Sequence, residues 1–354
     1  MRRAGKSTQH GISVLMPVRD GGRYLKAAVN SILQQEDVLL ELVLIDDHSQ
    51  DGAVQALAAD DRMTVISSPE PGIVPALNAG IAHARYPWLA RMDADDVAAP
   101  NRLALQLDYL LANPEVDICA TRVRMFREDE EVGQGYQHYE QWINNLHLHA
   151  DIEREFFIES PLPHPTVMLY RDTLLGLGGY QDCAWPEDYD LWSRALLAGL
   201  RFGKPDSAPL LNWRDQGNRL SRTDARYNKQ HFLQCKAHYL NQYLQARGIH
   251  TCAIWGTGPT GLKLHDYLEQ AGMMITQFID VNPNMSGRKK RGKPVSILRP
   301  DASSHELSRM FKEYKGVPDT LIVVAVSARG ARQEIGDCLR EFDLVEQKDF
   351  IFAA

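Results

Sequence analysis

The feature that most restricts the fold of this sequence is the regular alternation of strand and helix signals over its first hundred residues. Continuous apolar runs, typical of strands buried on both faces, alternate with segments whose apolar residues recur at helical spacing. This order predicts an α/β fold, with a mostly parallel sheet and helices on both of its faces. The predicted strands are Ile12–Pro17, Leu39–Ile45, Met63–Ser67 and Trp88–Met92, and the predicted helices are Tyr24–Gln35, Ala53–Ala59 and Asn78–Ala84.

The middle third of the chain is less regular. Its patterns predict helices over Arg102–Ala112 and Glu187–Ala198 and a strand over Thr166–Tyr170. A long amphipathic helix is predicted over Asp224–Arg247 and ends at Gly248, because glycine after a basic last turn is a typical helix stop.

A second, smaller α/β segment follows this helix. Its predicted strands are Thr251–Trp255, Met274–Ile279 and Leu321–Val326, and its predicted helices are Leu262–Ala271 and Ala331–Phe342. We therefore expect a disordered tail at 1–10, a first domain at 11–223, a connecting helix at 224–248 and a second domain at 249–354.

Acidic residues end two of the predicted strands, and ligands of open parallel sheets bind at the carboxyl ends of strands. Asp47 follows the second strand, and Asp93, Asp95 and Asp96 follow the fourth. Carboxylates two residues apart in an extended chain point the same way, and Mg²⁺ and Mn²⁺ prefer oxygen ligands. The pair Asp93 and Asp95 thus predicts a cation site for a diphosphate, although alone it also fits a solvated turn that begins a helix.

A second acidic pair, Glu187 and Asp188, opens a predicted helix directly after Pro186. Acidic side chains in a first turn are favoured by the helix dipole, so the pair fits an ordinary helix N-terminus. A carboxylate at such a place also suits a general base.

The second domain contains a glycine-rich turn between its first strand and its first helix. Gly256, Gly258 and Gly261 form the pattern GxGxxG, and Asp280 ends the next strand, 24 residues after Gly256. This is the dinucleotide-binding fingerprint in the context that it requires, so a Rossmann-like domain with a site for NAD(P) or another nucleotide is predicted. The alternative is a fold that binds nothing or only docks the first domain.

Charge and hydropathy exclude several classes of protein. The net charge of −7 argues against a general nucleic-acid binder. No apolar run approaches the roughly 20 residues of a membrane span, and no signal-peptide pattern follows the basic N-terminus. The five cysteines have no CxxC spacing. We expect a cytoplasmic protein without a transmembrane segment, and peripheral contact with the inner face of the membrane is compatible with this.

The first domain contains a series of motifs in a fixed order. They are Val14–Leu25, Glu41–Gly52, Ala76–Gly80, Ala90–Asp96, His164–Met168, Gly178–Tyr180, Pro186–Trp192 and Asn218–Ser221. Taken in this order, they resemble the motifs of the family 2 glycosyltransferases, which have the GT-A fold. The resemblance covers about residues 12–222. Arg19-Asp20 stands where the family commonly has Tyr-Asn, and His48 replaces the usual Gly.

This resemblance implies roles in binding a nucleoside-diphosphate sugar of the UDP or GDP type. By the resemblance, Pro17 and Arg19 line the base and ribose, and Asp47 accepts a hydrogen bond from the base. His164 stands where the family often places a histidine near the donor phosphates.

The resemblance also implies the chemistry. Asp93 and Asp95 form the DxD motif, with Asp95 the direct ligand of Mn²⁺ or Mg²⁺, and Asp188 is the general base. One base without a covalent nucleophile implies direct displacement with inversion at the anomeric carbon. The acceptor would be a saccharide or a lipid-linked hydroxyl in surface polysaccharide or glycolipid synthesis.

Three other functions fit the sequence less well. An NAD(P)-dependent sugar-nucleotide oxidoreductase or epimerase would centre on the second domain, but the sequence has no Tyr-x-x-x-Lys pair. A sugar nucleotidylyltransferase would need a glycine-rich start motif near Val14, which is missing. A binding module without catalysis disagrees with the intact set of Asp93, Asp95 and Asp188.

Overall fold

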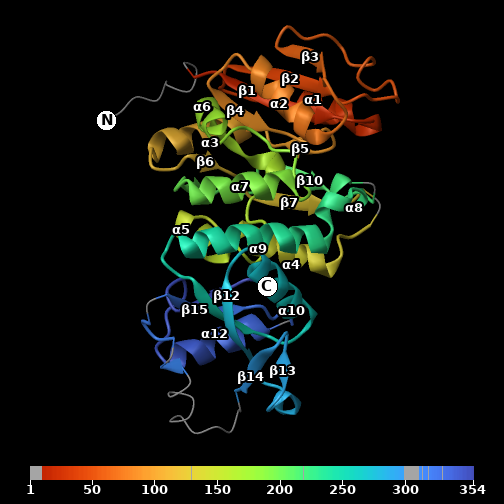
Figure 1. The fold of residues 1–354 in the computed structure, drawn as a ribbon. Coiled ribbons are helices and arrows are strands. Elements are labelled where there is room, and N and C mark those ends of the chain that lie inside the picture. The colour runs from red at the N-terminus through yellow and green to blue at the C-terminus, as the bar shows by residue number, and fades with distance from the viewer. Residues whose placement is uncertain are drawn as a thin grey trace. The chain divides into compact units, whose positions relative to one another are not determined.

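The computed structural model describes residues 10–128, 130–217, 219–298, 311–312, 314–317, 319–328 and 330–354. The expected tail lies outside the described residues except for His10, and so does Asn218 of the last motif. The chain forms two compact units (Figure 1). One unit combines Met1–Ile152 with Pro161–Asp224, and the other combines Glu153–Ser160 with Ala225–Ala354. The second unit thus includes the helix that we expected to connect two domains.

The first unit is built on a seven-stranded sheet of order β3-β2-β1-β4-β8-β6-β9. The first four of these strands are parallel to one another, whereas β8 runs antiparallel to both β4 and β6. The prediction of an α/β fold with a mostly parallel sheet is confirmed. The strands are β1 (Ile12–Val18), β2 (Leu40–Asp46), β3 (Met63–Ser67), β4 (Trp88–Arg91), β6 (Ile118–Cys119), β8 (Met168–Tyr170) and β9 (Phe202–Gly203).

A three-stranded sheet of order β5-β10-β7 completes the strands of the first unit. The sequence did not indicate it, because strands of two to four residues show no period. Its strands are β5 (Val97–Ala98), β7 (Val123–Phe126) and β10 (Leu211–Arg214). The helices of this unit are α1 (Leu25–Leu33), α2 (Ile73–His83), α3 (Arg102–Ala112), α4 (Gln134–Asn144), α6 (Arg171–Gly176), α7 (Glu187–Leu197) and α8 (Leu220–Thr223), and α5 (His149–Glu155) runs across the division between the units.

Helix α2 packs closely on the sheet at Gly80. A Cβ atom at Gly80 would lie 2.8 Å from Cδ1 of Ile45 and 3.3 Å from Cδ2 of Leu15, two core side chains of β2 and β1. The short distance explains glycine at this position of a helix, where it otherwise costs about 1 kcal/mol relative to alanine. The carboxyl ends of β1 and β2 lie next to each other because the two strands pair in parallel, Val18 with Asp46.

The helix predicted over Ala53–Ala59 is wrong. The structure has turns at residues 53–56 and a bend at residue 57. Asp51 accepts hydrogen bonds from the backbone amides of Gly22 (2.7 Å) and Ala53 (3.0 Å), and these bonds fix a loop. A segment of seven residues gains too little from helix propagation to compete, because nucleation is costly.

The second unit holds a six-stranded sheet of order β13-β14-β12-β11-β15-β16. All neighbours except the β13–β14 pair are parallel. Among the described residues of the chain, no helix is both long enough and apolar enough to cross a bilayer. The elements are α9 (Lys229–Gln245), β11 (Thr251–Trp255), α10 (Pro259–Gln270), β12 (Met274–Asp280), β13 (Lys289–Lys290), β14 (Lys293–Ile297), β15 (Thr320–Val324), α12 (Ala331–Glu341) and β16 (Phe350–Phe352).

Candidate functional site

Three carboxylates gather where the chain leaves β4. Asp93, Asp95 and Asp96 each offer one oxygen, and these oxygens lie within 4.8 Å of one another. The sequence predicted the first two as a pair, and the structure adds the third. Three oxygen donors at this distance can surround one divalent cation.

Each of the three carboxylates is held through one oxygen. Arg91 pairs with Oδ1 of Asp93, and Gln216 Nε2 donates to Oδ2 of Asp95 at 2.7 Å. The backbone amide of Arg214 donates to Oδ1 of Asp96 at 2.8 Å. The cluster is therefore fixed by β4 itself, by Arg214 at the end of β10 and by Gln216 just after β10, more than a hundred residues later.

The second carboxylate oxygen of Asp96 has surroundings that fit a bound cation. Asp96 is only 1% exposed, and its Oδ2 has no hydrogen-bond partner among the described residues. Burial and the charges of Asp93 and Asp95 raise the pKa of Asp96 well above its usual range, and burial and Asp93 raise that of Asp95. A divalent cation would remove this repulsion and give the orphaned oxygen a partner.

Asp188 lies in the first turn of α7 and is a half-buried carboxyl group. Its Oδ1 accepts a hydrogen bond from the amide of Tyr189 at 2.7 Å. Burial, followed by the negative charge of the adjacent buried Glu187, raises the pKa of Asp188 to about 7. A carboxylate with such a pKa can accept a proton near neutral pH.

His164 is buried beside α7 and hydrogen bonds through Nε2 to the hydroxyl of Tyr180 at 2.8 Å. Its other ring nitrogen lies 3.9 Å from Oε1 of Glu187. Burial and the charge of Arg91 lower the pKa of His164 well below its usual value, so the ring is neutral at pH 7. The ring of His164 thus contacts Tyr180 and α7, and a neutral ring offers a phosphate a hydrogen bond but no charge.

The residues predicted for the nucleobase and ribose lie at the adjacent carboxyl ends of β1 and β2. Pro17 is paired in register with Ile45, and the amide of Asp47 donates to the carbonyl of Val18 at 2.8 Å. Arg19 Nη1 lies 3.9 Å from Oδ2 of Asp47. The structure therefore brings together Pro17, Arg19 and Asp47, which the sequence separates by up to 30 residues.

Two hydrogen bonds join α2 to the loop before α7, and the sequence did not predict them. The side chain of Asn78 accepts from the amide of Tyr180 at 3.0 Å and donates to the carbonyl of Tyr180 at 2.9 Å. The preceding Gly179 has φ +67° and lies against Asn78, where a Cβ atom would come within 2.9 Å of Oδ1. Both residues belong to motifs that match the family, but the sequence does not show that these two motifs are in contact.

The known proteins to which this chain is similar in sequence are glycosyltransferases. The sequence profile of glycosyl transferase family 2 matches residues 13–176. The chain carries a family 2 glycosyltransferase domain. It is 28% identical over 247 residues to the O-antigen biosynthesis glycosyltransferase WbnJ of Escherichia coli, which covers 67% of this chain and 91% of WbnJ. It is 30% identical over 181 residues to the amylovoran biosynthesis glycosyltransferase AmsE of Erwinia amylovora, covering 49% and 65%.

Among solved structures, S. aureus TarS in complex with UDP-GlcNAc matches with 16% identity and a TM-score of 0.48. The match covers 66% of this chain and 72% of the TarS chain. The assignment of this protein as a glycosyltransferase rests on the sequence comparisons. Asp188 lies beyond the residues that the family profile matches, so its role depends on its own surroundings.

The glycine-rich turn of the second unit has the spacing of a nucleotide site, but its acidic residue is already engaged. Asp280 Oδ2 accepts hydrogen bonds from the amide of Thr257 (3.0 Å) and from its hydroxyl. A Cβ atom at Gly261 would lie 2.1 Å from the carbonyl oxygen of Gly256, so this glycine is needed for packing. A Cβ at Gly258 would meet nothing within 4 Å. Gly258 is therefore the glycine that packing does not explain.

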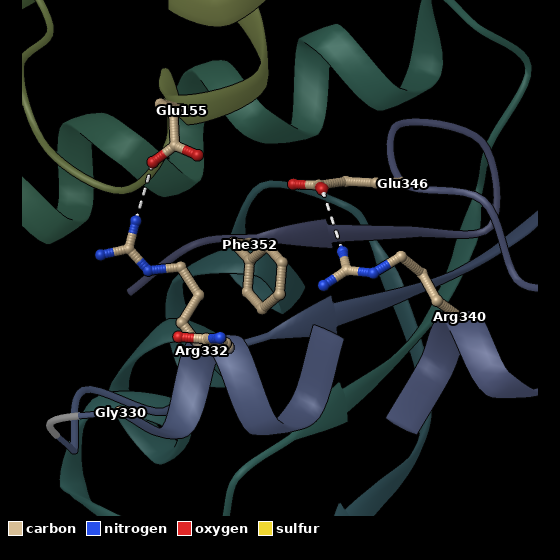
Figure 2. A pocket seen from close by; sticks show the side chains of 7 residues that line it. Glu155, Gly330, Arg332, Arg340, Glu346 and Phe352 are labelled. Atoms are coloured by element: carbon tan, nitrogen blue, oxygen red, sulfur yellow. Dashed lines mark hydrogen bonds and ion pairs between the residues drawn. The ribbon is translucent and has the colours of Figure 1, made fainter. Parts of the chain in front are cut away.

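A separate pocket of about 350 Å³ lies within the second unit (Figure 2). It is polar and contains two ion pairs. Arg332 Nη1 lies 2.8 Å from Oε2 of Glu155, and Arg340 Nη1 lies 3.9 Å from Oε2 of Glu346. None of the predicted site residues lines it. The lining residues are Glu155, Gly330, Arg332, Gln333, Arg340, Glu346 and Phe352.

Proposed function

We propose that this glycosyltransferase moves a sugar from a nucleoside diphosphate to an acceptor hydroxyl with inversion at the anomeric carbon. The observation that carries the proposal is Asp188, a carboxyl group whose pKa is raised to about 7, in the same compact unit as the acidic cluster of Asp93, Asp95 and Asp96. A base with a pKa near the working pH accepts a proton from the attacking hydroxyl most effectively. Inversion follows from a single displacement.

The acidic cluster would hold Mn²⁺ or Mg²⁺ through Asp93, Asp95 and Asp96. When bound, such a cation offsets the negative charge that develops on the departing diphosphate. The orphaned buried oxygen of Asp96 supports this assignment. Gln216 and the amide of Arg214 would keep the ligand oxygens in place.

Donor recognition is assigned to the adjacent ends of β1 and β2. Pro17 and Arg19 would line the base and ribose of a UDP- or GDP-type donor. Asp47 would accept a hydrogen bond from the base through an oxygen that the amide of Gly72 does not use. His164, neutral and buried, would lie near the donor phosphates as a hydrogen-bonding group.

The acceptor is proposed to be a saccharide or lipid-linked saccharide of a surface polysaccharide or glycolipid. The relatives WbnJ and AmsE, named for O-antigen and amylovoran biosynthesis, support this substrate class. The enzyme would act in the cytoplasm, in peripheral contact with the inner face of the membrane, where lipid-linked acceptors lie. The first unit would have the GT-A fold of its family.

The second unit is proposed to be a Rossmann-like nucleotide-binding domain. Its five parallel strands follow the order third, second, first, fourth, fifth along the sheet, which is the order of dinucleotide-binding folds. Gly256, Gly258, Gly261 and Asp280 would form the site for NAD(P) or another nucleotide. An NAD(P)-dependent activity on sugar nucleotides remains the second candidate function, and the unexplained Gly258 is the observation that favours it.

One experiment separates these functions. Calorimetric titration of the wild-type protein with UDP, GDP and NAD(P), with and without Mn²⁺, is expected to show nucleoside-diphosphate binding that requires the cation. Asp95→Ala should abolish this binding, whereas Gly258→Val should abolish only NAD(P) binding. NAD(P) binding without any response to nucleoside diphosphate or Mn²⁺ would overturn the transferase site and favour the second candidate.

A further inference from the structure

Arg91, the last residue of β4, is a buried cation between two groups of acidic residues. The residue is 7% exposed, and its Nη1 donates to Oδ1 of Asp93 in the acidic cluster. Its charge also acts on α7, where it opposes the effects of burial and of Glu187 on the pKa of Asp188. One guanidinium therefore contacts a proposed cation ligand and acts electrostatically on the proposed base.

Not every N–H group of the Arg91 guanidinium has a hydrogen-bond partner among the described residues. Nε of Arg91 is buried and has no hydrogen-bond partner among the described residues. Its backbone, in contrast, is fixed on both sides, because its amide donates to Val167 at 2.9 Å and its carbonyl accepts from Arg102 at 2.6 Å. A buried donor without a partner costs free energy, so a side chain on a fixed backbone that keeps one is suited to a ligand with acceptor oxygens.

Arg91 also differs from the other groups that hold the acidic cluster. Asp95 is held by the neutral amide of Gln216, and Asp96 is held by a backbone amide. Asp93 is held by a full positive charge. An arriving cation must therefore compete with Arg91 for Asp93, since two like charges at one carboxylate repel each other.

Resting on the proposed transferase site, we propose that Arg91 is a mobile counter-charge: it holds Asp93 until a divalent cation binds, releases this carboxylate to the cation, and then binds the oxygens of the donor diphosphate. Arginine is suited to this exchange because its planar fork fits carboxylates and phosphates alike. The side chain would thereby link loading of the cation to binding of the donor.

The test uses two affinities that should change in opposite directions. In Arg91→Met, calorimetry with MnCl₂ alone should show binding tightened about threefold or more, because the competing charge is gone. With saturating Mn²⁺, the affinity for UDP or GDP, whichever the wild-type protein binds, should fall about tenfold or more, because a charge-assisted hydrogen bond is lost. Damage to the fold would weaken both affinities together.

The matched control is Arg62→Met. Arg62 also pairs with an aspartate two residues away, at 2.9 Å from Asp60, but this pair lies outside the site. Its two affinities should equal those of the wild-type protein. In an Arg91→Met protein that is folded, two unchanged affinities, or a joint loss of both, would overturn the proposal.

A second variant covers the case in which Arg91→Met does not fold. Arg91→Lys keeps the positive charge but lacks the planar guanidinium group. Its affinity for Mn²⁺ should therefore stay within about twofold of wild type, while its affinity for the nucleoside diphosphate should fall. Wild-type affinity for the nucleoside diphosphate in this variant would overturn the proposal. If the wild-type protein bound neither Mn²⁺ nor UDP and GDP, the transferase site itself would be wrong.

Discussion

Asp188 is the residue on which the proposed chemistry depends most. Asp188→Asn keeps the shape of the side chain but removes the proton acceptor. We expect kcat to fall by about 10²–10⁴-fold, the usual contribution of a general base, while the dissociation constant of UDP or GDP with Mn²⁺ stays the same. Steady-state kinetics and calorimetry on one preparation measure both quantities.

Asp172 provides the matched control for this change. Like Asp188 in α7, it is the second residue of a helix, α6, but its side chain is 71% exposed. Asp172→Asn should leave kcat unchanged. If donor affinity fell in step with kcat in Asp188→Asn, the residue would be a donor contact and not the base.

The charge next to Asp188 gives a prediction about pH. A base acts in its deprotonated form, so kcat/KM should rise with pH through about 7, the raised pKa of Asp188. Burial and the Glu187 charge keep the proton on Asp188, so Glu187→Gln should lower this pKa and move the rise to lower pH. The pH profiles of the two proteins test this, and a midpoint that stayed or moved upward would contradict it.

At the scale of elements, the loop between α6 and α7 is held on α2 through Gly179 and Asn78. Gly179→Ala would add a Cβ atom 2.9 Å from Oδ1 of Asn78 at φ +67°, so the variant has both a clash and backbone strain. We expect the free energy of unfolding to fall by about 1–2 kcal/mol or more. Urea unfolding measures this change.

The neighbouring Gly178 separates the two causes. Its φ is +83°, but a Cβ atom would meet only Gln181 Nε2, at 3.7 Å. Gly178→Ala should therefore show the cost of the backbone conformation alone. Equal losses in the two variants would mean that the link between Asn78 and Tyr180 adds nothing measurable.

The same scale explains what the sequence could predict. Apolar runs and helical spacing gave β1, β2, β3 and β4 nearly to the residue, and acidic residues after β4 marked the cluster. The pattern could not show that Gln216 and Arg214 hold that cluster, because these contacts span about 120 residues, and Arg214 ends the short strand β10 while Gln216 follows it. Periodicity reports on burial within an element and not on which distant polar group meets it.

At the scale of the whole molecule, the division of the chain into two units differs from a simple break between successive domains. The segment Glu153–Ser160 belongs to the second unit, although residues on both sides of it belong to the first. Within the second unit, Lys236 of α9 donates to the carbonyl oxygens of Ile158 and Ala353, each at 2.9 Å. One buried ammonium group thus holds this segment and the chain after β16 to the same helix.

This arrangement predicts that Lys236 is essential to the second unit and dispensable for the first. Lys236→Met keeps the buried stem but leaves two carbonyl oxygens without their donor, so the free energy of unfolding of the second unit should fall by about 2 kcal/mol or more. Binding of UDP or GDP with Mn²⁺ by the first unit should not change. Lys315→Met, which removes a half-exposed ammonium group paired with Asp343, should leave both quantities at their wild-type values. Urea unfolding and calorimetry on the whole chain measure them, and a Lys236→Met protein as stable as the Lys315→Met protein would show that the segment is held by its other contacts.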